Sequence, residues 1–286
     1  MVLIGIAGSR LEISIAIYVG AIFVSDLVTI NLSRGFHGSD TTIRLARIFK
    51  ALASCLQDLK SYYERIPTSS PSDYSFLYPH PITANETALP PIKYDKYLGL
   101  NGLPIETVPD LGERSTAVYT GSFNGDKVLI KFTHRYNKKA HTLLAGAGLA
   151  PRLHFCNPIV GNLLMIVMDY IPDAKSVLRL RVEESPLPSI IPEQVEKAVT
   201  LLHNRDIVFG DLRDGNVIYA PPTPDQTDGR VMLVDFDWAG SHDIDRYSAT
   251  LNPAGGWADG VSQYVKMHKE HDLWQLNRLK EVVQAQ

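Results

Sequence analysis

The second half of the chain holds a loop whose residue types could do phosphate chemistry. Asp211 and Asn216 lie five residues apart in Asp-Leu-Arg-Asp-Gly-Asn, after an apolar stretch. A carboxylate in such a loop can accept the proton of an attacking hydroxyl, and an amide at this spacing can hold a magnesium ion on phosphates. A D-x-x-x-x-N spacing also arises about once by chance in a chain of ordinary composition, so an ordinary Asp-Gly turn stays open.

A second acidic segment begins at Asp235, 19 residues after Asn216 and directly after the apolar run Val-Met-Leu-Val. A carboxylate at a strand end, followed by Phe236, fits a magnesium ligand between two phosphates. A strand that simply ends in an acidic turn is the other interpretation. Asp237 could hold a second metal ion or face water, and we expect it to face water.

A lysine and a connecting segment complete the set. Lys131 lies in the apolar strand Leu-Ile-Lys-Phe, where a nucleotide-binding lysine can lie. Alternation along an edge strand would also place a lysine there. The apolar segment from Val167 to Ile171 runs toward Pro172 and has the character of a strand that leaves one lobe for another.

These segments occur in an order that resembles the protein-kinase-like superfamily, and in detail the kinase-like proteins of mushroom-forming fungi. The resemblance covers residues 90–280. The matching stretches are Val128 to Phe132, Gly148 to Pro151, Val208 to Arg213, Val234 to Trp238 and Glu270 to Asp272. Residues 4–64 resemble, more loosely, the segment that precedes the kinase domain in those proteins.

The resemblance implies a phosphotransferase that depends on ATP and Mg²⁺. Asp211 would be the catalytic base, and Lys131 would pair with the α- and β-phosphates. Asn216 and Asp235 would be the metal ligands. The phosphate acceptor would be a hydroxyl of a protein or of a small molecule.

Three further positions take their roles from the same resemblance. The backbone of Asp169 and Ile171 would contact adenine, and Gly112 would belong to the loop that covers the phosphates. Asp272 would brace the catalytic loop through backbone N–H bonds.

The chain also departs from the kinase pattern. No Asp or Glu lies between Lys131 and Asp169, so no helix glutamate can hold the lysine. The loop expected to cover the phosphates keeps one glycine of the kinase pattern, Gly112, and is one residue short. Phe209 replaces a histidine, and we expect it to pack in the same place. No A-P-E sequence follows. Because positioning supplies most of phosphoryl-transfer catalysis, an inactive pseudokinase that binds a nucleotide or a partner stays open. A purely structural interaction protein would leave the four aligned polar positions unexplained.

Composition narrows the class of protein. The chain has 286 residues, of which 45% are hydrophobic and 21% charged, and a net charge of -3. These values give no electrostatic case for binding nucleic acid or an anionic membrane surface. Cys55 and Cys156 form no disulfide or metal pattern, and the uncharged run from Ile13 to Ser25 is shorter than the ~20 residues that span a bilayer. We expect an intracellular, cytoplasmic protein without a membrane segment.

The elements that must position these residues fall into three regions. Residues 1–66 are expected to form strands over 11–19 and 21–31 and a helix over 41–64. Residues 67–91, rich in Pro, Ser and Thr, form a linker. Residues 92–286 form the kinase-like domain. The expected helix carries an apolar stripe that we assign to core packing: Leu45, Phe49, Leu52, Leu56, Leu59 and Tyr63.

The third region is expected to begin with strands and continue with helices. An Asn124-Gly125 turn predicts a hairpin between strands over 118–120 and 127–132. Helices are expected over 137–148 and 192–204, and strands over 163–170, 217–219 and 231–234. The fold class is therefore α+β: a two-lobed protein-kinase-like fold, with a reduced C-lobe, preceded by a small strand-strand-helix segment.

Overall fold

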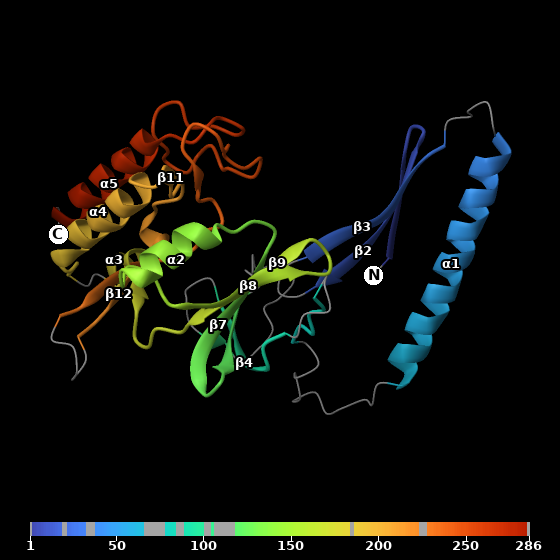
Figure 1. Cartoon of the computed structure of the whole chain (residues 1–286), viewed down its shortest axis with the longest axis horizontal. Coiled ribbons are helices and arrows are strands. Elements are labelled where there is room, and N and C mark those ends of the chain that lie inside the picture. The colour runs from blue at the N-terminus through green and yellow to red at the C-terminus, as the bar shows by residue number, and fades with distance from the viewer. Residues whose placement is uncertain are drawn as a thin grey trace. The chain divides into compact units, whose positions relative to one another are not determined.

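The computed structural model of the chain is shown in Figure 1. It divides into two compact units, Met1–His80 and Pro81–Gln286. Both units combine β-sheet with α-helix, as the sequence predicts. No helix in the described part of the chain combines the length and the apolar character needed to cross a membrane. The residues that the structure describes are 2–18, 22–32, 38–65, 78–83, 89–99, 104–105, 118–183, 186–222 and 228–284.

The first unit contains a three-stranded antiparallel sheet and a long helix. The strands β1 (Val2–Ala7), β2 (Arg10–Tyr18) and β3 (Ile22–Asn31) pair in the order β1-β2-β3, and α1 (Gly38–Arg65) follows. The expected strand-strand-helix segment is therefore wrong by one strand. β1 has apolar residues on both faces, so it lacks the alternation that marks a half-buried strand.

The apolar stripe of α1 is largely exposed to solvent. Phe49 is 44% exposed, Leu56 44%, Leu59 39% and Tyr63 62%. The expectation that this stripe packs into a core is wrong for these four side chains. Helical spacing defines an apolar face, but burial also needs a partner surface, which the spacing of residues on one helix cannot specify.

A six-stranded antiparallel sheet opens the second unit, in the order β5-β4-β6-β7-β9-β8. The predicted hairpin is confirmed: β6 and β7 meet at Asn124 and Gly125, whose positive φ angles of 52° and 92° suit a tight turn. β7 lies between β6 and β9, which places Lys131 opposite Val118 and Ile166. The strands are β4 (Ile92–Leu98), β5 (Pro104–Ile105), β6 (Val118–Phe123), β7 (Asp126–Thr133), β8 (Leu153–Ile159) and β9 (Leu163–Asp169).

Helices dominate the rest of the unit. The predicted helices over 137–148 and 192–204 are confirmed within two residues as α2 and α4. α4 packs against α5 around buried Leu202, Leu276 and Leu279 (Figure 1). The helices are α2 (Lys138–Gly146), α3 (Val177–Val182), α4 (Ile190–His203) and α5 (Lys269–Gln284), with a 3-10 turn, η2 (Asp214–Asn216).

Short strands connect these helices and carry the polar loops. Strands β12 and β13 are antiparallel neighbours. The turn η2 directly precedes β12, and Asp235 follows shortly after β13. This pairing brings two loops that are distant in sequence to the same end of a hairpin. The short strands are β10 (Lys175–Ser176), β11 (Ile207–Val208), β12 (Val217–Ala220), β13 (Arg230–Leu233) and β14 (Gly240–Ser241).

Candidate active site

The loop that carries Asp211 is fixed by side chains of α5. Asp272 is fully buried and accepts hydrogen bonds from the backbone N–H groups of Phe209 (2.7 Å) and Gly210 (2.9 Å). Gln275 accepts a third from Leu212 at 2.9 Å. Buried N–H groups that would otherwise lack partners are thus satisfied by one helical turn. The expectation that Asp272 braces this loop is confirmed.

Asp211 is itself buried, and two polar side chains surround its carboxylate. Arg213 lies 2.5 Å from Oδ1 through Nε and donates to Oδ2 at 2.7 Å through Nη2. The Asn216 side-chain amide donates to Oδ2 at 2.9 Å. Burial raises the pKa of Asp211 above its ordinary value, although Arg213 acts in the opposite direction. Arg213 was not among the site residues predicted from the sequence, and its position two residues after Asp211 was the available signal.

The second metal-ligand candidate, Asp235, is joined to the Asn216 turn through the backbone. The Val234 N–H donates to the Asn216 carbonyl at 3.0 Å, just before the chain turns at Asp235. Asp235 has a φ of 67°, in the left-handed region that non-glycine residues rarely adopt. Such strained backbone is concentrated at functional sites.

Lys131 reaches both acidic side chains of this turn. Its ammonium lies 2.8 Å from Asp235 Oδ1 and 2.8 Å from Asp237 Oδ1. The lysine side chain is 13% exposed, so the contacts are shielded from solvent. Burial acts to lower the pKa of Lys131, but the two carboxylates outweigh it and raise the pKa above its ordinary value. Burial acts to raise the pKa of Asp235, but Lys131 outweighs it and lowers the pKa.

Asp237 does not face water, and that expectation is wrong. Its side chain is 22% exposed, pairs with Lys131 and accepts a hydrogen bond from the Thr133 hydroxyl at 2.8 Å. Burial raises the pKa of Asp237 to about 7, with Asp235 acting in the same direction and Lys131 against it. The chain therefore supplies a second carboxylate to Lys131 from the turn after β13. Sequence separation of more than 100 residues concealed this contact.

An aromatic group anchors the turn between the two acidic residues. Phe236 is buried, stacks on the His141 ring of α2 at 4.7 Å and meets Phe209 edge-on at 5.5 Å. Phe209 thus packs inside, as the sequence predicts. His141 interacts with the Tyr136 hydroxyl through Nδ1 and the Pro151 carbonyl through Nε2, both at 2.7 Å. Burial lowers the pKa of His141 to about 4.

The residues expected to contact adenine lie at the end of β9. The Asp169 N–H donates to the Arg152 carbonyl at 2.9 Å, so the sheet already uses this donor. The Asp169 carboxylate lies 2.5 Å from the His154 ring, and the Ile171 carbonyl accepts from the Ala174 N–H at 3.4 Å. Their role toward adenine stays a prediction. Gly112 lies outside the described residues.

Comparison with solved structures finds a viral kinase among the structural neighbours of the chain. No protein-family model matches the chain, and no curated protein matches it. The kinase PK-1 of Cydia pomonella granulovirus has a solved structure that is similar over 67% of this chain and 67% of its own, with a TM-score of 0.45 and 14% sequence identity. Likeness at this level assigns no activity to the chain. The resemblance to kinase-like proteins of mushroom-forming fungi stays a prediction.

Proposed function

We propose that the chain is an ATP- and Mg²⁺-dependent phosphotransferase of the protein-kinase-like type. The observation that carries the proposal is the contact between Lys131 and Asp235, which joins two residues 104 positions apart at 2.8 Å. At the same end of the β12–β13 hairpin, Asp211 and Asn216 are in contact at 2.9 Å. A cation, two metal-ligand candidates and a base candidate therefore belong to one connected set of loops.

The order of elements supports the same assignment. An antiparallel sheet that carries Lys131 precedes a helical part that carries Asp211, and β9 leads from one to the other. Asp272 of α5 binds the backbone of the Asp211 loop. This is the organisation expected of a protein-kinase-like domain.

The donor set fits Mg²⁺, which prefers carboxylate and other oxygen ligands. Asp235 offers a carboxylate whose side chain is 40% exposed. Asn216 directs its NH₂ group to Asp211, which leaves its carbonyl oxygen as the group suited to a metal ion. The ion would neutralise charge on the phosphates of the bound nucleotide.

Asp211 and Lys131 would then have separate roles in the reaction. Asp211 would accept the proton of the acceptor hydroxyl while that oxygen forms a bond to the γ-phosphorus and the bond to the β-phosphate oxygen breaks, releasing ADP. The raised pKa of Asp211, caused first by burial, suits a base. Lys131 would bind phosphate oxygens, and Asp237, which pairs with it, would take the place of the missing helix glutamate.

A second candidate is a nucleotide-binding or partner-binding module without turnover. The observation that favours it is internal pairing: Asp211 contacts Arg213, and Asp235 contacts Lys131. If these ion pairs persist when nucleotide binds, neither carboxylate is free for its catalytic task. This candidate predicts binding of ATP without phosphate transfer.

Two measurements on the full chain separate the candidates. Thermal unfolding with and without ATP and Mg²⁺ tests for a nucleotide site, because a ligand that binds the folded state raises the unfolding temperature. Radiolabelled ATP turnover, compared between the wild type and Asp211→Asn, tests for catalysis. Stabilisation with turnover that Asp211→Asn abolishes supports the phosphotransferase. Stabilisation without turnover supports a nucleotide-binding module, and no stabilisation argues against any nucleotide site.

A further inference from the structure

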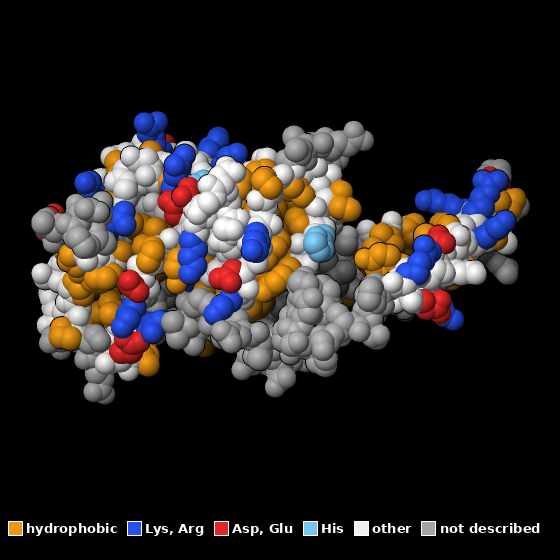
Figure 2. All heavy atoms as spheres, turned by 90° about the horizontal axis from the view of Figure 1, so that it is seen from below, with side chains coloured by type: hydrophobic (Ala, Val, Ile, Leu, Met, Phe, Trp, Pro, Cys, Tyr) orange, Lys and Arg blue, Asp and Glu red, His pale blue; other side chains and the backbone are white. Residues whose placement is uncertain are grey.

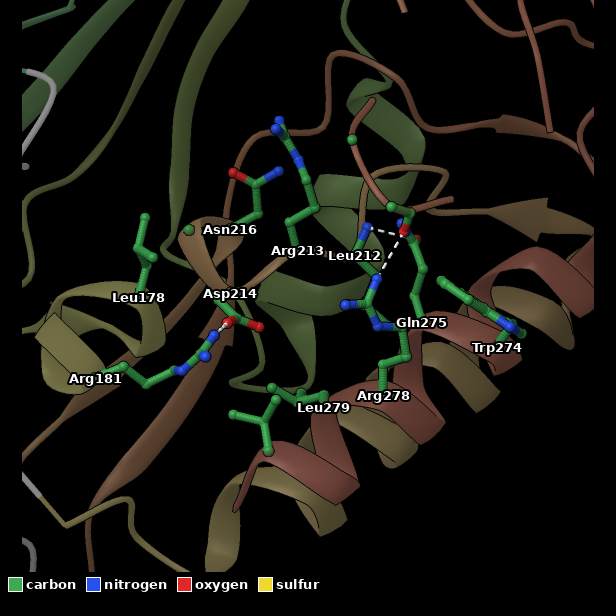
Figure 3. Close-up of a pocket in the computed structure, with 14 residues that line it drawn as sticks. Leu178, Arg181, Leu212, Arg213, Asp214, Asn216, Trp274, Gln275, Arg278 and Leu279 are labelled. Atoms are coloured by element: carbon green, nitrogen blue, oxygen red, sulfur yellow. Dashed lines mark hydrogen bonds and ion pairs between the residues drawn. The ribbon is translucent and has the colours of Figure 1, made fainter. Parts of the chain in front are cut away.

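A pocket with a cationic lining opens beside the Asp211 loop (Figure 3). Its volume is about 580 Å³, within the range of small-molecule sites. Its walls come from three elements and one loop: α3, the segment that follows Asp211, one face of α5, and the Gly255-Gly256 turn. Within the described residues, Arg181, Arg213 and Arg278 supply its positive charge and Asp214 its negative charge.

The arginines retain donors that could bind a ligand. Arg181 forms an ion pair with Asp214, and Arg213 forms one with Asp211. Each guanidinium has five N–H donors in a planar fork that matches phosphate and carboxylate oxygens. Side chains of Arg181 and Arg213 are 40% and 54% exposed, so these donors remain accessible from solvent. Figure 3 shows the Arg181 and Arg278 side chains entering from opposite walls.

Arg278 is held in a defined position. Its Nη1 donates to the Gly256 carbonyl at 3.0 Å, and its guanidinium lies 5.1 Å from the centre of the Trp274 ring, a cation–π geometry. Gly256 has a φ of 69°, and a Cβ there would lie 2.6 Å from Arg278 Nη1. The left-handed backbone favours glycine at this turn, and a larger residue there would displace the arginine from this position. A side chain held on two sides loses less conformational entropy when it binds a ligand.

The pocket is linked to the base candidate through Asn216. Asn216 lines it and donates to the Asp211 carboxylate at 2.9 Å. Gly215, between the Asp214 and Asn216 positions, leaves the wall open, because a Cβ there would meet only Leu178 at 4.0 Å. A molecule whose anionic group contacts the arginines would therefore lie beside Asn216, the residue that contacts the Asp211 carboxylate.

We propose that this pocket binds the phosphate acceptor, and that the acceptor is a small hydroxylated molecule carrying a phosphate or carboxylate group. The inference rests on the proposed phosphotransferase function, whose acceptor it specifies. The contacts expected are from Arg181 and Arg278 to the anionic group. Leu178 and Leu279 would pack against the carbon skeleton of the ligand.

Calorimetric titration of the full chain tests the proposal with two matched probes, glycerol 3-phosphate and glycerol. Binding of glycerol 3-phosphate, with no measurable binding of glycerol, is the expected result. Arg181→Gln and Arg278→Gln should each weaken this binding about tenfold or more, because each removes charge-assisted hydrogen bonds. Arg230→Gln, which alters an exposed arginine outside the pocket, should leave it unchanged.

A second set of measurements separates failure of this inference from failure of the proposed function. Stabilisation by ATP and Mg²⁺ should be retained in Arg278→Gln and lost in Lys131→Met. Binding of glycerol 3-phosphate should be weakened in Arg278→Gln and retained in Lys131→Met. If ATP stabilises the wild type but glycerol 3-phosphate does not bind, or binds equally well to Arg278→Gln, the acceptor proposal is wrong while the nucleotide site stands. Binding of an acidic peptide with no binding of glycerol 3-phosphate would also overturn it.

Discussion

The Lys131 ammonium lies 2.8 Å from a carboxylate oxygen of Asp237, a residue two positions after the metal-ligand candidate Asp235. The chain lacks an acidic residue on α2 that could hold the lysine. Asp237 supplies the missing carboxylate from the turn after β13, and Thr133 holds the other oxygen of that carboxylate at 2.8 Å. The carboxylate that positions the lysine therefore comes from the turn after β13 and not from α2.

Replacing Asp237 by Asn should weaken the use of ATP without unfolding the protein. Lys131 keeps Asp235 but loses one of its two charged partners, so we expect the KM for ATP to rise about tenfold. Steady-state kinetics with radiolabelled ATP measure the change. Asp243→Asn is the matched control, because that carboxylate is exposed and pairs with Lys266. An unchanged KM would show that Asp237 does not position the lysine.

The same residue should give the activity a pH dependence. Burial raises the pKa of Asp237 to about 7, so the carboxyl is protonated below that pH and its ion pair with Lys131 is lost. The kcat/KM for ATP should therefore rise with pH through about pH 7 and level off above it. In Asp237→Asn the rise of kcat/KM near pH 7 should be absent. If the variant shows the same rise as the wild type, another group must cause it.

Asp211→Asn should abolish turnover while leaving nucleotide binding intact. General-base catalysis contributes about 10²- to 10⁴-fold, so kcat should fall by at least about 100-fold. The thermal shift given by ATP and Mg²⁺ should remain, because Lys131 and Asp235 are unaltered. Asp206→Asn, which alters an exposed carboxylate paired with Lys269, serves as the control. Turnover that survives in Asp211→Asn would exclude this residue as the base.

Asp272→Asn should destabilise the second unit. The carboxylate is fully buried and accepts from the N–H groups of Phe209 and Gly210, with the His203 ring at 3.0 Å. An amide keeps the size but turns an NH₂ group toward one of these donors. We expect the free energy of unfolding to fall by about 2–4 kcal/mol, measured by urea denaturation. A loss as small as that of the exposed-site variant Asp243→Asn would contradict the bracing role.

His141 should make the protein less stable in acid. Its folded-state pKa is lowered to about 4 by burial, whereas an unfolded histidine titrates near its ordinary value of 6.5. The unfolded state therefore binds more protons between these two values, and the stabilisation present above pH 6.5 is lost as the pH falls toward 4. The loss should reach about 3 kcal/mol.

Urea denaturation of His141→Gln across this pH range measures the effect. The variant should lose the part of the pH dependence that His141 contributes, even if its stability at pH 7 is lower because the Phe236 stack is disturbed. His80→Gln, which removes an exposed histidine, should keep the wild-type profile. An identical slope in His141→Gln and the wild type would contradict the assignment.

Surface side chains show where sequence patterns were insufficient. The face of the molecule in Figure 2 carries hydrophobic side chains between charged ones, so apolar character alone does not mark the core. On α1 the stripe that includes Phe49 and Leu56 is exposed, although its spacing is helical. By contrast, Phe209 is buried as predicted, because its loop is drawn onto α5 by Asp272.

Local structure and the candidates for chemistry could be predicted from the residues alone. Turn residues specified the β6–β7 hairpin, and the spacing of Asp211, Asn216 and Asp235 identified the polar loops. These features depend on interactions between near neighbours in the chain, which a sequence displays directly.

The packing of the folded chain determines which distant side chains meet. It placed Asp237 on Lys131, turned the α1 stripe outward, and assembled the arginine pocket from α3, the Asp211 loop and α5. Such contacts are set by how sheets and helices pack and by the direction in which each loop leaves its strand. A carboxylate two residues after Asp235 can face water or a lysine, and the left-handed turn at Asp235 is followed here by a buried Phe236 that leaves Asp237 on Lys131.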